Sequence, residues 1–255
     1  MRFIVVVLSI LLTACASKPA PVAIKEKALF DQVINIDARH NGFDSPIRLW
    51  LTPGIYQIDP ISPLSGGMFT ARHAWAGENS GCDRTGMDCL QGWQWTVIVY
   101  TENESLAPLN RVYHNGKKIV WVPGPAALNM PPPSMFAPRA TADIAFTFAP
   151  RGERFRVLKE GFVLFFDIDR QAYDNLGGIS FRLHEIQLNG PDSDGDMYAD
   201  HEDAFPNHAS ARLDTDQDGY PDRWNLGQAN NDHKLSLDGF PYDNTRNHLP
   251  VMAIE

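Results

Sequence analysis

The feature that most constrains this chain is an aspartate-rich stretch near its C-terminal end, DSDGDMYADHED from Asp192 to Asp203. Five of its twelve residues are aspartates, and Glu202 adds a sixth carboxylate. Five like charges roughly 6 Å apart repel one another by about 7 kcal/mol in unscreened water. The stretch therefore either stays unfolded or is held together by something cationic.

The negative charge of the whole chain is concentrated in the same region. The formal net charge is −9, and 13 acidic and 3 basic residues lie between Asp192 and Asp243. The other 18 acidic and 19 basic residues leave the rest of the chain nearly neutral. Since 44% of the residues are hydrophobic, this remainder has enough apolar surface for one core. The sequence has no basic stripe interleaved with aromatic residues, so it does not indicate a nucleic-acid partner.

The first residues have the pattern of an export signal. Arg2 precedes the apolar run FIVVVLSILL, which is too short for the ~20 residues that a membrane-spanning helix needs. The run leads to LTAC, residues 12–15, which resembles the signal of bacterial lipoproteins, whose cysteine is acylated and becomes the new N-terminus. An ordinary secretory signal with a chance cysteine is the alternative.

The lipoprotein resemblance implies a signal peptide over residues 1–14, lipid on Cys15 and a tether over residues 15–27. Residue 16 is Ala rather than Asp, which in that family implies passage to the outer membrane. Two or three acyl chains would make the anchoring effectively permanent. We therefore expect a lipid-anchored protein of the outer membrane, on its periplasmic face or at the cell surface.

The other two cysteines, Cys82 and Cys89, bracket the turn-rich sequence DRTGMD. Outside the inner membrane the environment is oxidising, so we expect a disulfide between them. A closed loop this small contributes roughly 2.5 kcal/mol in the chain-entropy model. A metal site, for which no further Cys or His lies close in sequence, and two free thiols are the alternatives.

Residues 28–190 have the pattern of short strands separated by turn signals such as NG, TPG, SGG and RGE. The predicted strands are QVINI, IRLWL, GIYQID, GMFTARHAW, WQWTVIVY, KIVWV, DIAFTFA, RFRVL, GFVLFF and GISFRLHEIQL. Polar and apolar residues alternate in IAFTF and ISFRL, as in half-buried strands. Because no stretch has a long, capped 3.6-residue period, we expect an all-β fold, a β-sandwich or jelly roll.

After Asn189-Gly190-Pro191 the composition changes to Asp, Asn, Gly and Pro, which marks a boundary between the body and an acidic segment, residues 191–246, with a short tail at 247–255. A second loop, DTDQDGYPDRWN from Asp214 to Asn225, repeats the first with Asp at positions 1, 3, 5 and 9. Calcium prefers six to eight hard oxygen ligands, which such alternation directs at one centre. The predicted ligands of the first ion are Asp192, Asp194, Asp196, the Tyr198 carbonyl, Asp200 and Asp203. Those of the second are Asp214, Asp216, Asp218, the Tyr220 carbonyl, Asp222 and Asn225.

These loops resemble thrombospondin type-3 repeats, in particular the bacterial form that closes with D-x-F-P. Asp203-Ala-Phe-Pro and Asp238-Gly-Phe-Pro match that closure, so Asp238, with Asp232 as a further candidate, is expected to close the second site. The resemblance implies an extended, calcium-cored segment with little hydrophobic core. Met197 takes the usual glycine position of the first loop, so its turn must accommodate a side chain. A solvated acidic linker is the alternative.

The last hairpin of the body carries Asp167, Asp174 and Asn175 in a D-x6-D-N arrangement, followed by Gly177 and Gly178. This resembles the calcium loop of galactose-binding bacterial lectins of the PA-I type, which have a small jelly-roll fold. The resemblance implies a calcium ion held by these three residues that also coordinates sugar hydroxyls. The family's loop threonine is replaced by Gln171, and its sugar-contacting His has no counterpart before Cys82, so galactose specificity is not implied.

Together these features predict a calcium-binding outer-membrane lipoprotein that binds a surface glycan or envelope polysaccharide with the help of calcium. The alternative is a structural or adhesion protein that contacts envelope proteins, with calcium only rigidifying the repeats. Of the tryptophans, Trp50, Trp75, Trp93 and Trp95 could stack on a sugar but more often fill a core. We expect no enzyme, although Asp167 with Asp169 could serve glycoside hydrolysis.

Overall fold

The computed structural model describes residues 28–42, 44–73, 92–101, 106–107, 112–114, 117–122, 138–167, 172–225 and 235–247. Several predictions concern residues outside these ranges. They are the signal peptide, the lipid anchor at Cys15, the Cys82–Cys89 disulfide, Trp75, Asp169 and Asp232.

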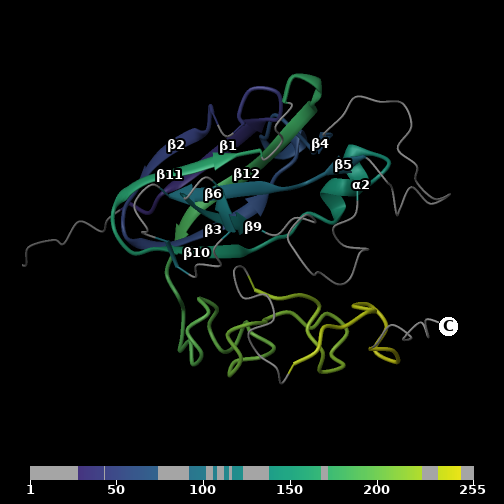
Figure 1. Cartoon of the computed structure of the whole chain (residues 1–255). Coiled ribbons are helices and arrows are strands. Elements are labelled where there is room, and N and C mark those ends of the chain that lie inside the picture. Colours follow the sequence, from purple (N-terminus) through teal and green to yellow (C-terminus); the bar gives the residue numbers. More distant parts are fainter. Residues whose placement is uncertain are drawn as a thin grey trace, which may run out of the picture.

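The body consists of two antiparallel sheets (Figure 1). The larger has the order β5-β4-β12-β3-β10-β7, and β1 also pairs with β12. Its strands are β1 (Asp31–Asp37), β3 (Gly54–Pro60), β4 (Arg72–His73), β5 (Trp93–Gln94), β7 (Leu106–Ala107), β10 (Glu153–Val157) and β12 (Leu176–Ile186). The smaller has the order β2-β11-β6-β9-β8. Its strands are β2 (Ile47–Leu51), β6 (Val97–Thr101), β8 (Val112–His114), β9 (Lys117–Val122) and β11 (Gly161–Phe166). The prediction of an all-β chain is confirmed.

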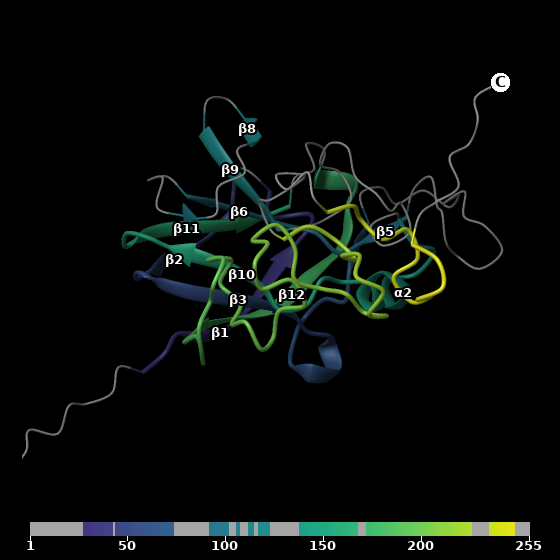
Figure 2. The same ribbon diagram turned by 90° about the horizontal axis from the view of Figure 1, so that it is seen from below.

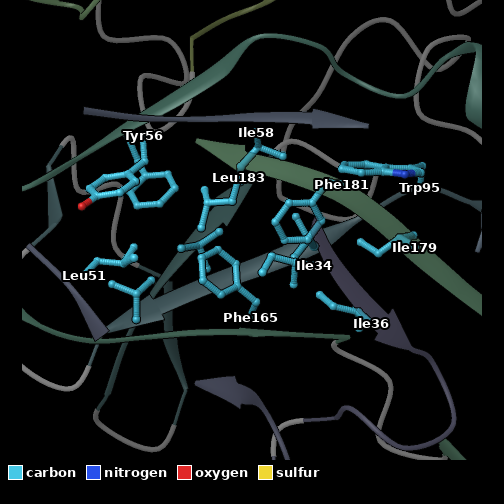
Figure 3. Close-up of a cluster of buried hydrophobic side chains, with 14 of the residues drawn as sticks. Ile34, Ile36, Leu51, Tyr56, Ile58, Trp95, Phe165, Ile179, Phe181 and Leu183 are labelled. Carbon is cyan, nitrogen blue, oxygen red and sulfur yellow. The ribbon is translucent and has the colours of Figure 1, made fainter. Parts of the chain in front are cut away.

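Buried residues of both sheets form one hydrophobic cluster (Figure 3). Alternate residues of a strand point to opposite faces of a sheet, and in β3 this alternation buries Tyr56 and Ile58. Phe165 of the smaller sheet lies 5.6 Å from Phe181 of the larger, between ring centroids. The cluster comprises Ile34, Ile36, Leu51, Tyr56, Ile58, Trp95, Val97, Val99, Ala149, Phe155, Val157, Val163, Phe165, Ile179, Phe181 and Leu183.

The prediction of a strand at DIAFTFA is wrong, because this sequence forms helix α2 (Ala142–Thr147). The Oγ1 atom of Thr141 accepts a hydrogen bond from the Ile144 N–H, which caps the helix, and Asp143 is in its first turn. Two short 3-10 turns, Pro63–Ser65 and Ala172–Asp174, are the other helical elements of the described residues. Within those residues, no helix has the length and apolar character needed to cross a bilayer.

The Gly177–Gly178 pair is required by close packing at the start of β12. A Cβ atom on Gly178 would lie 2.1 Å from the Ile36 carbonyl oxygen of β1, and one on Gly177 would lie 2.5 Å from the Ala71 carbonyl oxygen. Gly177 also has a positive φ of 67°. The two glycines therefore allow β12 to lie between β1 and the segment around β4, whether or not a metal binds nearby.

The acidic segment forms an irregular layer beside the body, below it in Figure 1 and seen from its outer side in Figure 2. Its described residues include no helix or extended strand, and one isolated bridge joins Ala211 to Trp224. The Tyr198 hydroxyl donates a hydrogen bond to the Gly152 carbonyl, and the Arg212 guanidinium donates one to the Arg151 carbonyl, just before β10. The acidic segment therefore lies against the larger sheet.

Candidate metal centres

The first aspartate-rich loop is shaped by hydrogen bonds from its own backbone to its own carboxylates. Asp192 accepts from the Gly195 and Met197 N–H groups at 2.9 and 3.2 Å. Asp196 accepts from the Tyr198 N–H at 2.8 Å. Such bonds are typical of aspartates in turns. As a result, one oxygen from each of Asp192, Asp194 and Asp196 lies within 4.8 Å of the others.

The second loop repeats this arrangement. Asp214 accepts from the Gly219 N–H at 2.9 Å, and Asp218 accepts from the Tyr220 N–H at 2.9 Å. Oxygens of Asp214, Asp216 and Asp218 likewise lie within 4.8 Å of one another. The prediction that the two loops bring equivalent carboxylates together therefore agrees with the geometry.

Both loops have a left-handed backbone at positions 4 and 6. The φ angles are 81° at Gly195 and 78° at Met197 in the first loop, and 63° at Gln217 and 90° at Gly219 in the second. Each loop thus has glycine at one of the two positions and a side chain at the other. Left-handed geometry costs a non-glycine residue about 1–2 kcal/mol. Met197 therefore has the glycine-like conformation that the sequence required of it.

The two aspartates of the D-x-F-P motifs are buried. Asp203 is 8% exposed and Asp238 is fully buried. One oxygen of each accepts the N–H of the motif's Phe, Phe205 at 2.7 Å and Phe240 at 2.8 Å. The other oxygen of each is buried and has no hydrogen-bond partner among the residues that the structure describes.

Electrostatics assign each closing aspartate to one loop. Burial, with repulsion from Asp194 and Asp192, raises the pKa of Asp203 to about 6, against the opposing Phe205 N–H and Arg212. Burial, together with the carboxylates of Asp218, Asp216 and Asp222, also raises the pKa of Asp238, against the opposing Phe240 N–H. These interactions show that Asp238 lies near the carboxylates of the second loop.

Burial also affects a carboxylate of the first loop itself. Burial, reinforced by Asp194 and Asp203 and opposed by the Tyr198 N–H, raises the pKa of Asp196 to about 7. In the described part of the chain, five buried oxygens without hydrogen-bond partners belong to Asp194, Asp203, Asp216, Asp218 and Asp238. Buried acceptors are normally satisfied, and a group of hard carboxylate oxygens suits calcium. The residues therefore fit two calcium ions.

Three predicted ligands make other contacts. Asp200 accepts from both the N–H and the hydroxyl of Ser193, and Asp222 accepts in the same way from Thr215. These position-9 aspartates brace their loops, and the hydroxyl residue at position 2 of both loops was the sequence signal. Asn225, predicted for the second ion, donates instead to Asp196 of the first loop, at 2.6 Å.

The structure also brings together the predicted residues of the body loop. The Asn175 amide nitrogen donates to the Ala38 carbonyl at 3.0 Å and to Asp167 at 3.4 Å. The side-chain oxygen of Asn175 and the Oδ1 atom of Asp174 are buried, and within the described ranges neither has a hydrogen-bond partner. Arg72, which the sequence did not single out, has its Nε atom 3.0 Å from Asp167. A calcium ion here would therefore share Asp167 with a guanidinium.

The tryptophans have different environments. Trp95 lies in the core against Phe181, and Trp93 lies edge-on to His73. Trp50 is exposed and meets Phe162 edge-on across strands β2 and β11.

Comparison with known proteins gives no further assignment: no protein family, no curated protein and no solved structure matches the chain.

Proposed function

We propose that this protein is a calcium-binding lipoprotein of the bacterial outer membrane, in which two calcium ions order the acidic segment beside a β-sandwich body. The observation that carries the proposal is the pair of closing aspartates, Asp203 and Asp238. Each is near carboxylates of one loop and has a buried oxygen without a hydrogen-bond partner among the described residues. Ionised carboxylates are almost never buried without a partner.

Calcium suits these sites better than other common metals. Zinc prefers nitrogen and sulfur ligands, and the predicted ligands of both loops are oxygens. Magnesium demands a near-ideal octahedron and retains several waters, whereas calcium accepts six to eight oxygens in flexible geometry. The irregular backbone of the loops, with two left-handed positions in each, favours the more tolerant ion.

For the role of the ions we propose structural rigidity as the first candidate. The acidic segment contacts the body through buried side chains such as Tyr198 and Arg212, so an ordered segment would extend the body by a second layer. Such a layer would suit a structural or adhesion protein of the cell envelope.

Calorimetric titration of the full chain in detergent tests the proposal. We expect at least two calcium ions to bind, and both Asp203→Asn and Asp238→Asn to remove or weaken one of them. Asp243→Asn is the matched control, because Asp243 bonds locally to Thr245 and Arg246. Absence of calcium binding at millimolar concentration would contradict the proposal. Labelling with a radioactive fatty acid, lost in Cys15→Ser, tests the lipid anchor.

Calcium-dependent glycan binding is the second candidate, and the unpartnered oxygens of Asp174 and Asn175 favour it. A calcium ion on these oxygens would offer an open coordination position to vicinal hydroxyls of a sugar. We expect retention on a glycan array that chelator abolishes and Asp174→Ala reduces, with Asp44→Ala as an exposed control. Retention that survives excess chelator would contradict this mechanism.

A further inference from the structure

A buried glutamate joins the acidic segment to the body. Strand alternation places Glu153, the first residue of β10, on the same face as Phe155 and Val157, and only 1% of Glu153 is exposed. Its carboxylate forms ion pairs with Arg212, at 3.1 Å, and with Arg223. Breaking a buried ion pair by removing one partner is strongly destabilising. The body therefore depends on the acidic segment to neutralise Glu153.

Arg212 lies just before the second aspartate-rich loop, and Arg223 lies within it. Arg212 precedes Asp214 by two residues, and Arg223 directly follows Asp222. Arg212 also donates to the Arg151 carbonyl at 3.0 Å. Both guanidinium groups pair with the Glu153 carboxylate. The backbone between Arg212 and Arg223 must therefore adopt a conformation that brings both side chains to the body at once.

The first loop supplies a second anchor, Tyr198, at its position 7. The Tyr198 hydroxyl donates to the Gly152 carbonyl at 2.7 Å and accepts from the Arg154 N–H at 3.1 Å. The Arg154 and Arg212 guanidinium groups lie 4.4 and 4.2 Å from the centroid of its ring. Cation–π contacts of this kind are worth more when they are shielded from water.

Arg154 of the body reaches back into the first loop. Its Nη1 atom donates to the Met197 carbonyl at 2.8 Å, and its Nη2 atom lies 2.9 Å from Glu202. Met197 is the residue with the left-handed backbone, and its N–H bonds to Asp192. The body therefore contacts the part of the loop whose conformation gathers the carboxylates.

We propose that calcium binding docks the acidic segment on residues 151–154, and that loss of calcium releases it. This inference rests on the proposed calcium sites. Without the ions, repulsion among the carboxylates opens the loops and separates Tyr198, Arg212 and Arg223 from one another. By thermodynamic reciprocity, the same contacts strengthen calcium binding.

The Arg154 amide is a direct reporter of docking, because its hydrogen bond goes to Tyr198 of the acidic segment. We expect hydrogen exchange of this amide, measured in the full chain by mass spectrometry with residue-level fragmentation, to be at least tenfold faster in EDTA than in calcium. The Leu183 amide, in the core strand β12, should exchange at the same rate in both.

Two variants separate docking from calcium binding. In Tyr198→Phe and in Glu153→Gln we expect the same number of bound calcium ions, about tenfold weaker calcium affinity and fast exchange at Arg154 even in calcium. Asp31→Asn is the matched control: its exposed ion pair with Arg182 joins β1 to β12 within the body, so the affinity should change by less than about threefold. Tyr198→Phe keeps the test valid if Glu153→Gln does not fold.

The outcomes are distinguishable. If calorimetry detects calcium and Arg154 exchanges equally fast with and without it, docking is not controlled by calcium and this inference is wrong, while the calcium sites stand. If calorimetry detects no calcium, the proposed function fails first, and the inference fails with it.

Discussion

The raised pKa values of the loop aspartates predict that acid can partly replace calcium. In the absence of calcium, Asp196 has a pKa of about 7 and Asp203 a pKa of about 6, against 3.8 in an unfolded chain. The folded segment therefore binds protons more tightly than the unfolded segment. Stabilisation by these protons is complete below about pH 4 and is lost as the pH rises through 6 and 7.

The magnitude follows from the shifts. At 1.36 kcal/mol per pKa unit, ionised Asp196 costs the calcium-free segment about 4 kcal/mol and ionised Asp203 about 3 kcal/mol. Solvent screens these charges little, because Asp196 is 6% and Asp203 8% exposed. The two groups repel each other, so the combined cost is smaller than the sum.

Asp196→Asn removes the negative charge of Asp196. It should change the stability of the calcium-free segment and of the calcium-bound segment in opposite directions. In EDTA at pH 7.5 the substitution removes the cost of about 4 kcal/mol for ionised Asp196 but weakens the hydrogen bond from Asn225 by about 1 kcal/mol. We therefore expect it to stabilise the calcium-free segment by about 3 kcal/mol. In calcium we expect it to destabilise the segment, because a ligand is lost. Differential scanning calorimetry at pH 5.0 and 7.5, with and without calcium, measures both effects.

Asp243→Asn is the control, because its pKa is lowered by Thr245 and Arg246 and it should not stabilise the calcium-free chain. The reasoning would be refuted if the calcium-free chain melted at the same temperature at pH 5.0 and 7.5. It would also be refuted if Asp196→Asn lowered the stability of the calcium-free chain.

Three further substitutions have expected outcomes. Gln217→Gly should raise the free energy of unfolding by about 1 kcal/mol, because Gln217 is an exposed residue with a positive φ. Gly219→Ala should lower the free energy of unfolding by about 1 kcal/mol, because Gly219 also has a positive φ and no neighbouring atom would contact the new Cβ. Thermal melts in calcium check both. Gly178→Ala should prevent normal folding of the body, since its Cβ would overlap a β1 carbonyl; a cooperative melt with unchanged circular dichroism would contradict this.

The sequence predicted the body well wherever polar and apolar residues alternate between turn signals. GIYQID, for example, was predicted as a strand and forms most of β3. The same criterion failed at IAFTF, because alternation over five residues also occurs in a short helix and the capping Thr141 was not weighed. Tertiary packing against β5 then stabilises a helix that is too short to be stable alone.

The candidate sites were predicted from spacing, which identifies ligands within a loop but not contacts between distant residues. The aspartates at positions 1, 3 and 5 converge as predicted. The partners of Asp167 and Glu153, which are Arg72 and the pair Arg212 and Arg223, depend on the fold and could not be found from spacing. One signal was available: the alternation in ERFRV places a glutamate on the inner face, where a charge needs a partner.

Asn225 belongs to one loop by its place in the chain and to the other by its hydrogen bond to Asp196. A calcium ion bound in the first loop, as proposed, would be coordinated by Asp196, the carboxylate to which the Asn225 amide donates. Binding there would therefore change a hydrogen bond made by the last residue of the second loop. The two proposed calcium ions would therefore not bind independently. Occupation of one loop should therefore change the calcium affinity of the other, and Asn225→Ala should remove this coupling.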